Sequence, residues 1–168
     1  MIGTIPTQLS GIAAEFVKRA MRRICSAMAN AISGQMLAPA GLVIFGATAT
    51  TVKTGALAVY ATVNGRLVAI PAATVLPVLA GTVLINTFNV FVFYVNNAGV
   101  IVGNMGIPGV ALGGVIWPQT PLGSTIVGAF TVNPTTASFI GNTTALDAAN
   151  TNVVYISPTG AFDPSINF

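Results

Sequence analysis

The sequence predicts a mainly β protein: an antiparallel β-sandwich or barrel-like body of jelly-roll type that follows an N-terminal amphipathic helix or arm. Three observations support this prediction. The stretch 87–102 (TFNVFVFYVNNAGVIV) is apolar on both sides of an extended chain and rich in β-branched and aromatic residues. Short apolar runs separated by turn residues recur roughly every eight to twelve residues. Basic residues cluster on one face of the N-terminal segment.

The first predicted element is a helix from about residue 11 to about residue 31, with Ser10 as its N-cap and Ser33-Gly34 as its stop. Its apolar and polar residues separate onto opposite faces. We predict that both faces dock onto a partner, through Phe16, Lys18, Arg19, Arg22, Arg23, Ile24 and Met28. We accordingly divide the chain into an arm (1–34), a linker (35–52) and a β body (53–168).

Two hairpins are expected in the body. In the first, Asn64-Gly65 separates the apolar runs 56–63 and 66–70, and such a pair favours a tight turn because both residues tolerate positive φ. In the second, the runs 87–95 and 100–102 are joined by the turn residues Asn-Asn-Ala-Gly. This second hairpin is the expected centre of the core.

The other runs are shorter. The run 75–85 contains Pro77 and Gly81, so we expect either an interrupted strand or a loop that packs inward. Further strands are predicted at Val110–Trp117, Ser124–Val132, Ala137–Ile140 and Asn152–Ile156.

Charged residues are scarce. They make up 5% of the 168 residues, whereas a soluble domain usually has about 25%. The net charge of +3 belongs to the N-terminal segment, because Lys53, Arg66, Asp147 and Asp163 cancel. A lone monomer with so neutral a surface would be poorly soluble, so we expect burial in an assembly or a membrane. The proline, glycine and asparagine residues within 67–95 disfavour a membrane-spanning helix.

The sequence offers little for catalysis or metal binding. It has no His, one Cys (Cys25), and three acidic residues, Glu15, Asp147 and Asp163. We expect Glu15 to pair with Lys18 or Arg19 on the helix, and the two aspartates to serve in turns or caps. The chain is therefore predicted not to be an enzyme and to need no cofactor.

The part from about residue 52 to residue 168 resembles a group of bacteriophage virion proteins of unassigned or decoration-type role. The segments that carry the resemblance include YATVNGRL (60–67), TFNVF (87–91), GAFTVNP (128–134), FIGNTTALD (139–147) and GAFDP (160–164). The resemblance implies a structural protein of a tailed-phage particle, similar to capsid cement proteins or head fibres.

On this basis we expect a non-enzymatic virion protein, made in the host bacterial cytoplasm, that stabilises the phage head by bridging capsid subunits. Its partners would be further copies of itself, with a trimer favoured as the resemblance implies, and the major capsid protein or other virion proteins. A tail or head-fibre subunit is one alternative. A membrane-associated protein whose basic helix lies on anionic lipid is another. The basic face would also suit packaged nucleic acid.

Overall fold

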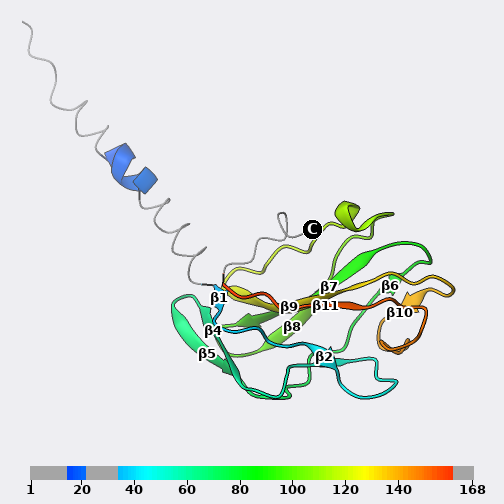
Figure 1. Ribbon diagram of the computed structural model, residues 1–168. Helices are drawn as coiled ribbons and strands as arrows, with labels where there is room; N and C mark the ends of the chain where they lie inside the picture. Colours follow the sequence, from blue (N-terminus) through cyan, green and yellow to red (C-terminus); the bar gives the residue numbers. More distant parts are fainter. Residues whose placement is uncertain (1–14, 22–33, 161–168) are drawn as a thin grey trace, which may run out of the picture.

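The computed structural model describes residues 15–21 and 34–160. This part of the chain is mainly β with antiparallel sheets, which confirms the predicted class (Figure 1). Residues 15–21 are helical. The rest of the predicted helix lies outside the described residues, and so do Arg22, Arg23, Ile24, Cys25, Met28 and Asp163.

The larger sheet has four strands in the order β11–β9–β7–β8. They are β7 (Asn89–Asn96), β8 (Ile101–Met105), β9 (Ser124–Val132) and β11 (Val154–Ile156). All residues of β7 except Asn96 are buried. The prediction of a central strand that is covered on both faces is therefore confirmed.

The second sheet has three strands in the order β1–β4–β5: β1 (Gln35–Met36), β4 (Val59–Val63) and β5 (Arg66–Ile70). Two smaller ladders complete the body. One pairs β2 (Val43–Ile44) with β3 (Val52–Lys53), and the other pairs β6 (Thr82–Val83) with β10 (Phe139–Ile140).

The main core lies between the two larger sheets. Phe91 stacks on Phe130 with a centroid distance of 5.2 Å and meets Phe139 edge-on at 5.7 Å. These rings belong to one buried cluster with side chains from the three-stranded sheet, namely Met36, Ala61, Val63, Val68 and Ile70. In Figure 1 the β4–β5 hairpin lies below the four-stranded sheet.

A second core covers the opposite face of the four-stranded sheet. Val90, Val92, Tyr94, Ile126 and Ala129 form this cluster, and Val115, Trp117 and Ile156 pack against it. Most of the covering side chains come from the segment after β8, which contains the 3₁₀ turn η1 (Leu112–Gly114) and lies above the sheet in Figure 1.

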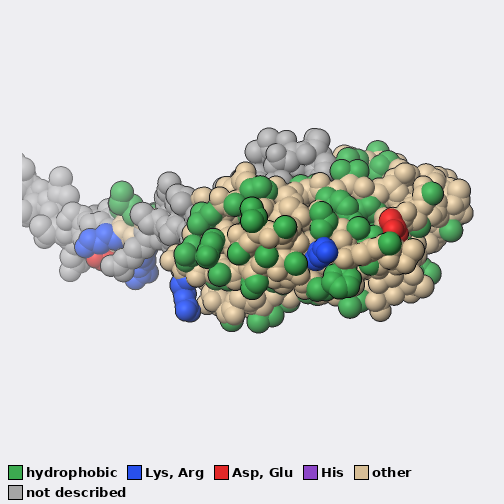
Figure 2. Space-filling view, turned by 60° about the horizontal axis from the view of Figure 1, so that its bottom comes forward, with side chains coloured by type: hydrophobic (Ala, Val, Ile, Leu, Met, Phe, Trp, Pro, Cys, Tyr) green, Lys and Arg blue, Asp and Glu red, His purple; other side chains and the backbone are tan. Residues whose placement is uncertain are grey.

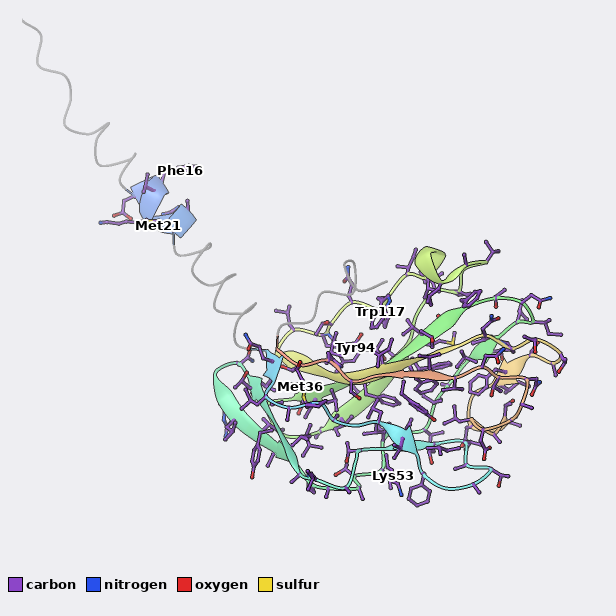
Figure 3. All side chains as sticks on the ribbon, viewed as in Figure 1. Phe16, Met21, Met36, Lys53, Tyr94 and Trp117 are labelled. Carbon is purple, nitrogen blue, oxygen red and sulfur yellow. The ribbon has the colours of Figure 1, made fainter. Side chains whose placement is uncertain are left out.

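The hydroxyl group of Tyr94 ties this covering segment to the sheet by donating a 2.9 Å hydrogen bond to the carbonyl oxygen of Pro118. In Figure 3, Tyr94 lies on the side of the sheet that faces Trp117. Burial raises the pKa of Tyr94 to about 12.

The prediction of a strand at Val110–Trp117 is wrong. The segment folds back on itself, with Ile107 bridging Ile116 and η1 between them. Glycine makes this possible, because a Cβ on Gly109 would lie 2.6 Å from the carbonyl carbon of Gly114.

The segment predicted as a linker, 35–52, packs as part of the body. It contributes β1, β2 and the buried side chains of Met36, Ala40 and Leu42. The run 75–85 is largely a loop that packs inward through Leu76 and Leu79 before the short β6. The last two predicted strands exist but are shorter than expected.

A β-bulge interrupts the pairing of β7 with β9. Phe93 pairs with Gly128, but the next residue, Tyr94, pairs with Ile126, so Val127 is the extra residue. The bulge changes which side chains face which core. Val127 joins the main core, whereas its neighbour Ile126 joins the second core beside Tyr94.

Candidate interaction surfaces

The helical residues 15–21 are exposed apart from the half-buried Ala20. The ammonium group of Lys18 lies 3.1 Å from a carboxylate oxygen of Glu15, which is one of the two predicted pairings. Both side chains are exposed, so this pair contributes at most about 1 kcal/mol. Phe16 is 74% exposed and Met21 63%, and Figure 3 shows both on this short helix. The apolar face is therefore open to a partner.

A larger apolar surface lies on the outer side of the three-stranded sheet. Leu37 donates its backbone N–H to Tyr60, and the ladder then pairs Tyr60 with Ala69 and Thr62 with Leu67. Because paired residues of an antiparallel ladder point to the same side, these side chains share one face. Leu37, Tyr60 and Leu67 are 56%, 46% and 63% exposed. We call Leu37, Tyr60, Leu67 and Ala69 the outer apolar face.

The turn at one end of this face is the predicted one. Asn64 has φ 50° and Gly65 has φ 72°, and they connect β4 to β5. Both residues are in the left-handed region, as a two-residue hairpin turn of this type requires. The turn fixes the register that places Tyr60 and Leu67 on the outer apolar face.

The described part of the body carries three charged residues, and two of them have structural partners. The ammonium group of Lys53 lies 5.6 Å from the ring centroid of Phe45. A carboxylate oxygen of Asp147 accepts a 2.8 Å hydrogen bond from the backbone N–H of Thr48. This contact ties two loops together and fits the turn role predicted for Asp147. The third charged residue, Arg66, is exposed at the start of β5.

A hollow of about 310 Å³ lies beside Asp147. Its lining includes Ile44, Leu146, Asn152 and Tyr155. Burial, and secondarily the charge of Asp147, raises the pKa of Tyr155. One carboxylate that is bonded to a backbone amide, together with one phenol, forms no recognisable catalytic pair. Within 15–21 and 34–160, no group of three or more His, Cys, Asp or Glu residues is placed to hold a metal ion.

Several sheet edges have no partner strand among the described residues. β5 ends the three-stranded sheet, and β8 and β11 end the four-stranded sheet. The sequence did not reveal these edges, because strand order depends on pairings between residues far apart in the chain. No helix in the described part of the chain is long and apolar enough to cross a membrane.

Comparisons with known proteins place the chain in no family: no family model, no curated protein and no solved structure matches it significantly. In Figure 2, groups of hydrophobic side chains spread over the visible face of the body, with few charged ones among them.

Proposed function

We propose that this chain is a non-enzymatic structural protein of a phage particle, in which a β-sandwich body self-associates and an N-terminal helical arm docks onto the shell. Within that class, we favour a decoration or cement protein that bridges capsid subunits. The resemblance noted in the sequence supplies the phage context, and the surface of the body supplies the physical argument.

The observation that carries the proposal is the outer apolar face. Leu37, Tyr60 and Leu67 are about half exposed or more on one side of the three-stranded sheet, and the same sheet buries Met36, Ala61 and Val63 on its other side. Exposed apolar patches of this kind are typical of interfaces between proteins. At about 25 cal/mol per Å², burying 800 Å² of apolar surface would contribute about 20 kcal/mol before the costs of association.

The exposed apolar side of the short helix supports a docking role for the arm. Phe16, Val17 and Met21 need an apolar partner surface, and the basic residues beside them suit an acidic one. Exposed ion pairs are weak, so the apolar side would dominate affinity and the basic side would set orientation. A groove in the shell protein fits both requirements.

Removing residues 1–34 tests the whole proposal. The described body begins at β1, so the truncated protein should stay folded and oligomeric while losing attachment to particles. Native mass spectrometry reports the oligomer, for which we favour a trimer, and cosedimentation with purified particles reports attachment. As a matched control, changing Lys18, Arg19, Arg22 and Arg23 to Gln should weaken attachment modestly and reduce its salt sensitivity. Full occupancy of particles by the truncated protein would exclude the arm as the anchor, and a stable monomer at micromolar concentration would exclude self-assembly.

Membrane association is the second candidate, because the same helix exposes Phe16 and Val17 beside Lys18 and Arg19. An amphipathic helix with this pattern can lie in the interface of an anionic bilayer. Flotation with vesicles that contain anionic lipid separates the two functions. Comigration of the full chain but not of the truncated protein would support the membrane and contradict the capsid assignment.

A further inference from the structure

The outer edge of β8 exposes a regular set of unused backbone groups. The N–H of Gly106 bonds the carbonyl oxygen of Val90, and the N–H of Asn96 bonds that of Val100. β7 and β8 pair without a register shift between these points. In an antiparallel ladder the hydrogen-bonding direction alternates along a strand. The even-numbered residues of β8 therefore bond to β7, whereas Ile101, Gly103 and Met105 direct their N–H and C=O groups outward.

This edge is complementary to itself. If two β8 strands pair antiparallel about a two-fold axis at Gly103, Gly103 lies opposite its own copy and Ile101 lies opposite Met105. By symmetry, Met105 also lies opposite Ile101 of the other copy, so there are three pairs. Each pair joins outward-directed groups, which gives up to about six hydrogen bonds in total. Ile101 and Met105 both pack against the main core, so their contact across the axis would extend that apolar layer from one copy into the other.

The strand also lacks the features that normally protect an edge. Natural sheets discourage edge pairing with charges, prolines, bulges or a covering element. β8 (IVGNM) has no charged residue and no proline, and Val102, Gly103 and Asn104 are exposed. Among the described residues no strand pairs with its outer side. Because the body is almost uncharged, a second copy meets no electrostatic repulsion there.

We propose that β8 is a homotypic interface, at which the four-stranded sheets of two copies join into one continuous sheet across a two-fold axis at Gly103. The inference deepens the proposed function and rests on its claim of self-association. A two-fold contact alone gives a dimer. If the predicted trimer forms through the outer apolar face, the β8 contact joins neighbouring trimers, as a bridging protein requires.

Residue-resolved hydrogen exchange on the full chain tests the pairing directly. In the assembled protein, the amides of Ile101, Gly103 and Met105 should exchange as slowly as those of Val102 and Asn104, which already bond to β7. On dilution to monomer, the three outward amides should lose protection while the other two keep it. Fast exchange of the outward amides in the assembled protein would overturn the proposal. Protection that persists in the monomer would also overturn it, because a segment of the same chain would then cover the edge.

A charge variant provides a second test of the β8 interface. V102K/N104K places like charges opposite each other in the proposed pair, so it should reduce the assembled mass and abolish protection of the outward amides. L57K/L122K is the matched control, since it adds the same charge at residues that are 79% and 96% exposed and lie outside β8. An unchanged assembly for V102K/N104K would refute the β8 interface and leave the proposed function standing. A wild-type protein that is monomeric throughout would refute self-association itself.

Discussion

The hydroxyl group of Thr125 in β9 donates a 2.8 Å hydrogen bond to the carbonyl oxygen of Thr62 in β4. This bond joins the two larger sheets at a position where Thr125 is 3% exposed. It exists because of the bulge in β9: the extra residue Val127 turns Thr125 toward the three-stranded sheet, opposite Val95 of the main core.

Replacing Thr125 with Val should therefore destabilise the body. The shape is nearly conserved, but the carbonyl group of Thr62 loses a buried donor, which costs about 1–2 kcal/mol. Urea unfolding measures the change. Thr125→Ser keeps the hydroxyl group and should retain the part of the stability that the hydrogen bond supplies. If the Val variant is as stable as the wild type, the hydrogen bond does not stabilise the contact between the sheets.

Gly65→Val should lower the free energy of unfolding by more than about 1 kcal/mol, because a β-branched residue is strained at φ 72°. Thermal unfolding gives the change. Gly113→Val is the matched control, since a Cβ there meets nothing within 4 Å and its φ lies outside the left-handed region. Equal melting temperatures for the two variants would contradict the importance of the turn.

Gly128→Ala should overpack the core. A Cβ at this position would lie 2.6 Å from Cδ1 of Leu42 and 3.0 Å from the carbonyl oxygen of Ile156. We expect a loss of about 1–3 kcal/mol in urea unfolding. In a double-mutant cycle, Leu42→Ala should partly relieve the clash. The double variant should therefore lose less stability than the sum of the losses of the two single variants. Full additivity would show that Leu42 does not restrict this site.

Tyr94→Phe should change the alkaline stability of the protein. The folded-state pKa of about 12 lies above the value of about 10 for an unfolded chain. The stabilisation from the protonated phenol is therefore complete below about pH 10 and is lost as the pH rises toward 12. At about pH 8 the variant should be less stable by about 1 kcal/mol, because Pro118 loses its donor. Between about pH 8 and pH 11 its free energy of unfolding should fall less than that of the wild type, and a parallel fall would contradict this account.

The local patterns of the sequence were sufficient for the class and for both hairpins. The Asn64-Gly65 pair specified its own turn, and the two-sided apolar run identified β7 as a central strand. Ser124–Val132 was predicted with its observed bounds. These features depend on neighbouring residues, which is why they can be seen in the sequence.

Other features depend on partners far along the chain. Gly109 allows a close approach to the backbone of Gly114, and this fold-back replaces the strand predicted at Val110–Trp117. Residues of the predicted linker entered the core because β1 pairs with β4. For the docking residues, the structure shows Phe16, Lys18 and Arg19 exposed. The outer apolar face and the exposed edge of β8 depend on the order of the strands in the sheets, which local sequence patterns do not specify.

The pairing of β7 with β9 also has a consequence for how the chain folds. Phe93 and Gly128 are separated by roughly 35 residues, so closing this loop is slower than forming the β4–β5 and β7–β8 hairpins. Until β9 arrives, one edge of an apolar strand stays uncovered in the nascent chain. The period of greatest risk of aggregation during synthesis therefore ends when residues 124–132 reach β7.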